Sequence, residues 1–198
     1  MTPPRPYPSY DVLEKWDTPS WDDTTRRVVK NRLRPPAPRH FDAPRFAILE
    51  ALCDTALPQP DRAPPIPVAQ MVDAAVAEAR GAGTRWHPLP PMQEAWTRAL
   101  ALIDAEAQAT HGSPFTALSP DRRTALLHAI DRGETSADWD LPPQDVLRKV
   151  ILDEIVRAYY AHPDAWSEIG FGGPASPRGY VRLAAGRLDS WEAPPGRR

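Results

Sequence analysis

With 198 residues the chain suits one domain, large enough for a single core that buries most of its apolar side chains. Its 24 Lys and Arg residues against 26 Asp and Glu residues give a net charge of −2, which provides no general attraction to nucleic acid or to anionic lipid. The single cysteine, Cys53, excludes an intrachain disulfide and a metal site built from several cysteines. We therefore expect no nucleic-acid partner and no structural metal.

The amino-terminal segment MTPPRPYPSYDVLEKWD contains no apolar run of the kind found in signal peptides. No later segment approaches the roughly 18 consecutive apolar residues of a membrane span. The twin arginines Arg26-Arg27 and Arg122-Arg123 lie inside amphipathic patterns and are interpreted as helix surface rather than export signals. We expect a cytoplasmic protein without direct membrane insertion, and a periplasmic one only if a partner's export signal carries it.

Proline divides the chain, because its 26 copies gather in a few clusters and leave the segments between them almost free of it. Proline lacks an amide donor and clashes with the preceding helical turn, so these clusters mark helix ends and connectors. Residues 1–40 form a proline- and tryptophan-rich arm with two short predicted helices, YDVLEKW and PSWDDTTRRVVKNRL. The second is expected to face inward through Trp21, Val28 and Leu33. The sequence leaves open whether this arm packs on its own domain or on a partner.

Five further segments carry apolar residues at helical spacing. Asp42 and Ser119 are candidate N-caps, while Gly112 and Gly133 are typical of helix ends. The predicted helices run from Asp42 to the ALPQP segment, and over 68–79, 92–107, 119–133 and about 143–160. The last of them has its apolar side chains on one face, namely Leu147, Val150, Ile151, Ile155, Ala158 and Tyr159.

The absence of any sustained period of two favours an all-α fold, a single helical domain of about five to seven helices with proline-rich connectors. We assign residues 41–183 to this domain, with a Gly/Pro-rich loop near its end, and residues 184–198 to a carboxy-terminal tail.

The closing stretch WSEIGFGGPASPRGYVRL raises the question of a phosphate-binding loop. Such a loop follows a strand or opens a helix, whereas this one follows a helix, contains no Lys and is interrupted by prolines that remove amide donors. Arginine and aromatic side chains on a rigid loop are instead typical of protein interfaces. An intramolecular lid over the core remains the alternative for each aromatic residue. The candidate partner-docking residues are Trp166, Phe171, Gly172, Gly173, Pro174, Arg178 and Tyr180.

Glu154 falls within the apolar stripe of the last long helix and is a candidate buried polar residue. A carboxylate there could act as a base, but pairing with an arginine or capping of a neighbouring backbone is favoured, since no second catalytic group accompanies it. The five histidines are scattered and form no metal-binding pattern. We therefore predict no catalytic, cofactor-binding or metal-binding residues in this chain.

Three segments together resemble the gluconate 2-dehydrogenase subunit 3 family. They are HFDAPRFAILEALCDTALPQP, FTALSPDRRTALLHAIDRGE and AYYAHPDAWSEIGFGGPASPRGYVRL, and the resemblance covers about 40–183. Its strongest parts are the SP-x-x-R helix start at Ser119 to Arg123 and the ending that contains Glu154, Tyr160, Pro163, Gly172 and Gly173.

The resemblance implies a small accessory subunit without a cofactor of its own. Its partner would be a large FAD-containing dehydrogenase subunit of the glucose-methanol-choline (GMC) type that oxidises a sugar, sugar acid or alcohol, and which the small subunit stabilises or helps to mature. Members commonly begin with a twin-arginine signal, and here the proline- and tryptophan-rich arm stands in that place. Two alternatives stay open: a stand-alone helical scaffold or regulatory module, and an enzyme that uses Glu154 with an arginine of the closing loop.

Overall fold

The computed structural model describes residues 7, 9–35, 37–80, 88–174 and 191–193. Within these ranges the regular structure is helical and no strand occurs, so the predicted all-α fold is confirmed. The chain divides into two compact units, one formed by residues 36–158 and the other by residues 1–35 together with 159–198. Each unit is described by itself below.

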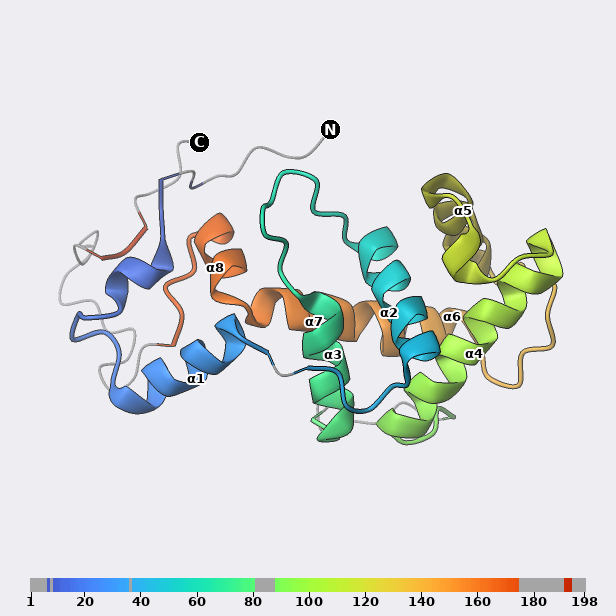
Figure 1. Cartoon of the computed structure of the whole chain (residues 1–198), viewed down its shortest axis with the longest axis horizontal. Helices are drawn as coiled ribbons and strands as arrows, with labels where there is room; N and C mark the ends of the chain where they lie inside the picture. The colour runs from blue at the N-terminus through green and yellow to red at the C-terminus, as the bar shows by residue number, and fades with distance from the viewer. Residues whose placement is uncertain (1–6, 8, 36, 81–87, 175–190, 194–198) are drawn as a thin grey trace. The chain divides into compact units, whose positions relative to one another are not determined.

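The unit of residues 36–158 is built from helices of unequal length (Figure 1). Their bounds are α2 (Ala43–Ala56), α3 (Val68–Ala77), α4 (Met92–His111), α5 (Pro120–Arg132), α6 (Pro143–Asp145), the π-helical segment η3 (Val146–Leu152) and the first part of α7 (Asp153–Ala161), with a short 3-10 turn, η2 (Phe115–Ala117), between α4 and α5. Its core contains fully buried side chains from nearly all of them: Leu49, Leu52, Trp96, Leu100, Ile103, Phe115, Ile130, Ile151 and Ile155.

The ends of these helices follow the local signals in the sequence. The Asp42 side chain accepts a hydrogen bond from Arg45 N, and the Ser119 hydroxyl accepts one from Arg122 N, so both predicted N-caps are confirmed. Gly112 and Gly133 end α4 and α5 in the left-handed region, with φ of 64° and 76°. Helix α3 stops two residues before the predicted end, since Ala79 already has a φ of 51°.

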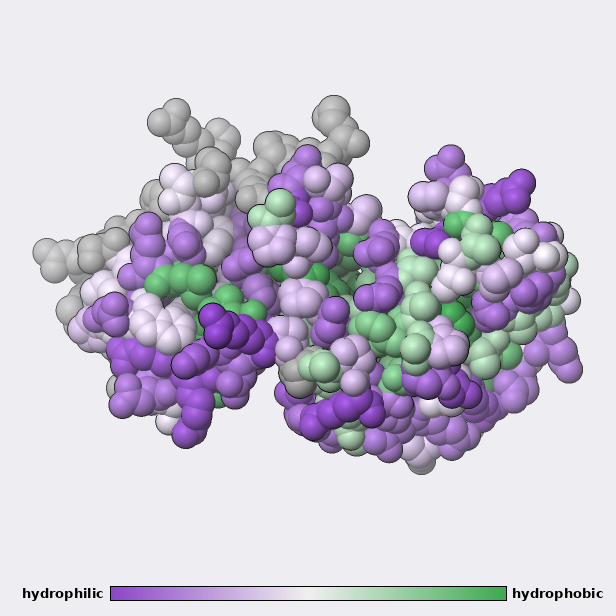
Figure 2. Space-filling model, in the orientation of Figure 1, coloured by the Kyte–Doolittle hydropathy of each residue, from purple (hydrophilic) through white to green (hydrophobic). Residues whose placement is uncertain are grey.

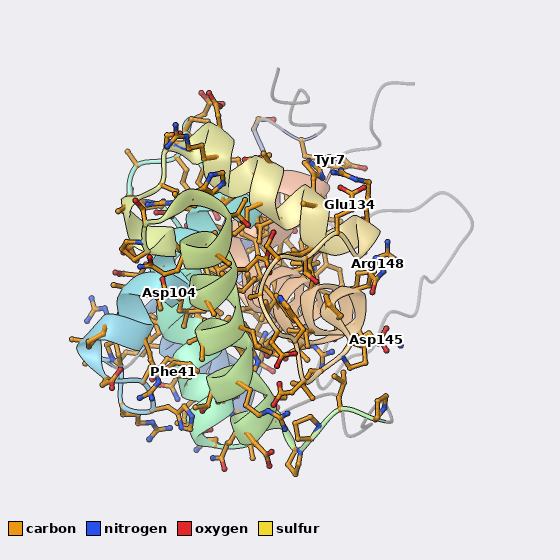
Figure 3. All side chains as sticks on the ribbon, turned by 90° about the vertical axis from the view of Figure 1, so that its right-hand side faces the viewer. Tyr7, Phe41, Asp104, Glu134, Asp145 and Arg148 are labelled. Atoms are coloured by element: carbon orange, nitrogen blue, oxygen red, sulfur yellow. The ribbon has the colours of Figure 1, made fainter. Side chains whose placement is uncertain are left out.

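The helix expected from about 143 to 160 is continuous from Pro143 to Ala161 but is not uniform. Residues 146–152 adopt the wider π-helical geometry, and the backbone stays right-handed at both junctions, Asp145 and Asp153. Arg148, labelled in Figure 3, extends from this segment, and its Nε donates to Asp131 Oδ1 of α5 at 2.5 Å. Single π-helical turns of this kind interrupt an α-helix where one residue more than usual is accommodated per turn.

Three acidic side chains of this unit hold connecting segments in place. Asp73 on α3 is fully buried and accepts hydrogen bonds from the backbone amides of Arg39, His40 and Phe41. On α4, Asp104, labelled in Figure 3, accepts from Phe115 N at 2.8 Å. The segments that lead into α2 and η2 are therefore fixed through their own amide groups.

Glu106, two residues further along α4, is buried and accepts hydrogen bonds from four different residues. Its carboxylate accepts from Ser136 N, Ala137 N, the Trp139 indole N–H and the Thr110 hydroxyl, at 2.7 to 3.1 Å. Burial alone would raise the pKa of Glu106, but the hydrogen bonds from Ser136, Trp139, Ala137 and Thr110 outweigh it and lower that pKa. The segment between α5 and α6 is thereby tied to α4.

The second unit contains the amino-terminal arm and the carboxy-terminal segment. Its regular elements are a 3-10 turn, η1 (Val12–Lys15), and two helices, α1 (Asp23–Leu33) and α8 (Pro163–Ile169), which lie next to each other (Figure 1). Asp11 and Asp22 cap η1 and α1. The two short arm helices were predicted, whereas α8 was not, because its sequence was interpreted as part of the closing loop.

A small apolar cluster forms the core of this second unit. Val12, Trp21 and Val29 come from the arm and Trp166 comes from α8, with Tyr10, Leu13, Trp16 and Leu33 packed around them. The inward position predicted for Trp21 is confirmed, but that of Val28 is wrong, since Val28 is 41% exposed and Val29 is fully buried. The helix that starts at the Asp22 cap brings Thr25 and Val29, four residues apart, onto its inner face.

No helix among the described residues is long and apolar enough to cross a membrane. In the space-filling view of Figure 2, pale and full green residues lie over α2 and α4 among purple, hydrophilic ones.

Cys53 of α2 is buried, as expected from its place on an apolar helix face. Burial, with Asp54 and Glu50 acting in the same direction, raises the pKa of its thiol.

Candidate partner-docking site

The carboxy-terminal helix α8 begins with a compact cap. His162 is buried, and its Nδ1 accepts a hydrogen bond from Asp164 N at 3.3 Å, while Pro163 occupies the first helical position. The helix ends at Gly170, whose φ of 68° turns the chain back so that Phe171 N donates to Trp166 O at 2.9 Å. This is the Schellman arrangement, which requires a left-handed residue and is served best by glycine. The start of the closing loop is thus a defined helix end.

Trp166, a predicted docking residue, belongs to the core of its unit and is 3% exposed. Its indole N–H donates to Tyr160 O at 2.6 Å, and the Arg32 guanidinium stacks over its ring at 5.5 Å. Phe171 meets the same ring edge-on at 5.7 Å between centroids but keeps 41% of its surface exposed. For Trp166 the intramolecular role weighed in the sequence analysis is therefore observed, while Phe171 presents an aromatic face to the exterior.

The glycines after α8 are covered by the amino-terminal arm. Lys15 is 4% exposed, and its ammonium group donates to Gly172 O at 2.5 Å. A Cβ atom at Gly170 would lie 2.7 Å from the ring of Tyr7, and one at Gly173 would lie 3.0 Å from Trp166 and 3.1 Å from Trp21. Glycine is needed here because arm side chains sit directly against the backbone. These contacts place the arm against the carboxy-terminal segment of the same unit.

The remaining predicted docking residues fall at the margin of this site or beyond it. Gly173 is buried, whereas Gly172 and Pro174 are partly exposed. Arg178 and Tyr180 lie outside the described residues. Docking by these residues is untested and stays a prediction.

Glu154, the predicted buried polar residue, lies in the first turn of α7 and is 7% exposed. Its nearest cation is Arg157, with 3.8 Å between Nε and Glu154 Oε2, and Arg157 also pairs with Asp153. Burial is the largest influence and raises the pKa of Glu154, although the positive charges of Arg157 and Arg80 oppose it. Among the described residues no group of three or more His, Cys, Asp or Glu side chains is arranged to hold a metal ion.

Comparison with known families identifies residues 43–173, well over half of the chain, with the model of the gluconate 2-dehydrogenase subunit 3 family. The chain belongs to this family. The resemblance seen in its motifs is thereby confirmed. No curated protein and no solved structure matches the sequence significantly.

One motif that resembles the subunit 3 family now has a physical explanation. In the SP-x-x-R motif, Ser119 caps α5, and the Arg123 side chain donates to the carbonyls of Phe115 and Thr116 in η2. Its guanidinium also lies 5.6 Å from the Phe115 ring centroid. The motif thus joins a helix start to the turn before it, and its role is structural. The matched range also ends at Gly173 and begins at residue 43, so it contains α8 and its glycines but leaves the arm outside.

Proposed function

We propose that this chain is a small, non-catalytic subunit that binds a large FAD-containing dehydrogenase of the GMC type, acting on a sugar, sugar acid or alcohol. The observation that carries the proposal is the family match over residues 43–173, since the family is named for a subunit of gluconate 2-dehydrogenase. In this proposal the FAD belongs to the large subunit, and the small subunit stabilises that protein or helps it to mature.

The docking surface proposed here is centred on Phe171 and extends along the closing loop to Arg178 and Tyr180. Phe171 supports it because its ring is held by Trp166 and yet remains 41% exposed. A rigid aromatic side chain of this kind loses little conformational freedom on binding and buries a large area. Two other apolar side chains of the same unit, Tyr160 and Ile169, are 45% and 47% exposed.

The test is co-purification of this chain with a large FAD-dependent dehydrogenase subunit of the same organism, followed by affinity measurement. We expect a complex that carries flavin absorbance, whereas the small subunit alone is colourless. Phe171→Ala, and separately Arg178→Ala with Tyr180→Ala, should each weaken the complex by about 2 kcal/mol, roughly thirtyfold.

Val28→Ala serves as the matched control, because Val28 has the same 41% exposure as Phe171 but belongs to α1. Melting curves of every variant separate loss of docking from loss of folding. A wild-type chain that forms no complex would leave a stand-alone scaffold as the better explanation, and turnover of a sugar or alcohol by the purified chain would contradict a non-catalytic role.

A further inference from the structure

The arm covers a surface that the family match contains, although the arm lies outside that match. Helix α8 and the glycines as far as Gly173 fall inside the matched range, which begins only at residue 43. The arm reaches α8 at its middle, where Val12 N donates to the Ser167 hydroxyl oxygen at 3.0 Å, and at its end, where Tyr7 lies against Gly170. Trp166 is 3% exposed in a cluster to which the arm contributes the other three buried members.

Two polar groups of the arm are buried without a hydrogen bond within the described part of the chain. The Tyr10 hydroxyl and the Trp21 indole N–H are both buried and have no hydrogen-bond partner among the described residues. A buried donor without a partner costs free energy that it does not cost in water, so part of what the apolar cluster gains is lost again. Groups of this type lower the free energy needed to open a packed segment.

We propose that the arm is a displaceable strap, and that the α8 surface beneath it, centred on Trp166 and Gly173, is a second part of the docking surface for the large dehydrogenase subunit. This inference rests on the proposed function. In the free subunit the arm occupies the surface in cis. On assembly the large subunit replaces the arm, because the same apolar and glycine-lined surface accepts an aromatic side chain from either source. Because only subunits with an open strap can bind at this surface, the apparent affinity for the large subunit falls in proportion to the open fraction.

A disulfide staple tests whether the arm must leave. Val12 N and Ser167 Oγ are 3.0 Å apart. With ordinary bond lengths the two Cα atoms lie within about 7 Å, a separation that a disulfide can bridge. The full chain with Val12→Cys and Ser167→Cys is compared in oxidised and reduced form for binding to the large subunit. The native Cys53 is buried and does not compete for the new thiols. We expect the oxidised form to bind at least about thirtyfold more weakly than the reduced form.

A second variant separates displacement of the arm from distortion of α8 by the staple. Trp21→Ala removes the largest arm side chain from the cluster and leaves every residue of α8 in place. A loosened strap should tighten binding by at least about threefold. An arm that stays in place predicts unchanged or weaker binding for the same variant. Val28→Ala, on the exposed side of α1, controls for an arm substitution outside the cluster and should leave the affinity unchanged.

The outcomes are distinguishable. Equal binding by the oxidised and reduced forms of the Val12→Cys and Ser167→Cys chain, or unchanged or weaker binding by Trp21→Ala, would overturn the strap while leaving the accessory-subunit function intact. Failure of the unmodified chain to bind the large subunit would overturn the proposed function, and the strap with it.

Discussion

The two units of this chain differ in how completely their buried polar groups are paired. In the unit of residues 36–158, Asp73 and Glu106 are buried carboxylates whose oxygens accept hydrogen bonds from backbone amides and from an indole N–H. In the unit that contains the arm, the Tyr10 hydroxyl and the Trp21 indole N–H have no partner among the described residues. The first arrangement is typical of a permanent core, because satisfied networks fix one conformation. The second is typical of packing that can be exchanged.

The largest effect that bears on this comparison is expected from Asp73→Ala. The change leaves the amides of Arg39, His40 and Phe41 without their acceptor in a fully buried place. We expect the free energy of unfolding to fall by about 3 kcal/mol or more, measured by urea denaturation. Asp54→Ala, an exposed aspartate on α2, is the control and should change stability by less than about 0.5 kcal/mol. A small loss for Asp73→Ala would mean that the connecting segment does not depend on its carboxylate anchor.

A smaller effect, of opposite sign, is expected from Glu154→Gln. The long 3.8 Å approach of Arg157 leaves this carboxylate less well compensated than Asp73 or Glu106. Burial raises the pKa of Glu154. At pH values above the ordinary pKa of a glutamate side chain, the folded state therefore binds more protons than the unfolded state. Stability contributed by the protonated form is therefore present at low pH and is lost as the pH rises through the folded-state value.

Glu154→Gln removes that loss. We expect the free energy of unfolding to rise by about 1 kcal/mol at pH 7 and by much less near pH 4, where Glu154 is mostly protonated in both states. Urea unfolding of the wild type and the variant at both pH values measures the difference. Glu50→Gln, an exposed glutamate on α2, should show neither the gain nor its pH dependence. A loss of stability at pH 7 would instead indicate that the pair with Arg157 is net stabilising.

The smallest effect separates two tyrosines of the same unit. The Tyr159 hydroxyl donates to Glu168 Oε2 at 2.7 Å, whereas the Tyr10 hydroxyl has no partner within the described part of the chain. Tyr159→Phe should cost about 1 kcal/mol, and Tyr10→Phe should be neutral or stabilising by about 0.5 kcal/mol. Thermal melts of the two variants give the comparison directly. Equal losses would show that the Tyr10 hydroxyl is satisfied in solution.

The dependence of folding stability on pH in the alkaline range tests the surroundings of Tyr10 independently. Burial, followed by the Glu192 carboxylate, raises the pKa of Tyr10 to about 12 from its usual 10.0. Above pH 10 the unfolded state loses this proton first, so the stability that Tyr10 contributes declines as the pH rises from 10.0 toward 12. In Tyr10→Phe that part of the decline should disappear.

The long helices of this fold were predictable because their signals are local. Asp42, Ser119, Gly112 and Gly133 act within one turn of the helix ends that they mark. Helix α8 was not predicted because it has only seven residues, and the stretch from Trp166 onward, which includes its Gly170 end, was interpreted as loop. Adjacent valines in the short helix α1 made its inner face ambiguous, and the choice of Val28 over Val29 was wrong by one position.

The candidate site was predictable only in part, because its main contacts join residues far apart in sequence. Phe171 was singled out as a docking residue of the closing loop, and it is exposed, while its role in docking stays a prediction. Trp166 looked equivalent to it, but the arm covers Trp166, and nothing near residue 166 in the sequence indicates a contact with Val12 or Lys15. The glycines were interpreted as part of a rigid docking loop, whereas Gly170 and Gly173 make room for the rings of Tyr7, Trp21 and Trp166. Such pairings become visible only when the chain is folded.

The π-helical segment of residues 146–152 is the place where this helix can change length by one residue without turning its faces. A π-helical turn holds one residue more than an α-helical turn, so deleting one residue there would restore regular α-helical winding and leave the residues that follow on their present faces. Ile155 would stay buried and Val156 exposed, whereas deleting Asp153 from the α-helical part would turn both by about 100° around the helix axis. Sequence alignments within the family that open a one-residue gap within residues 146–152 therefore still pair equivalent faces of the helix, and a gap placed after residue 152 does not.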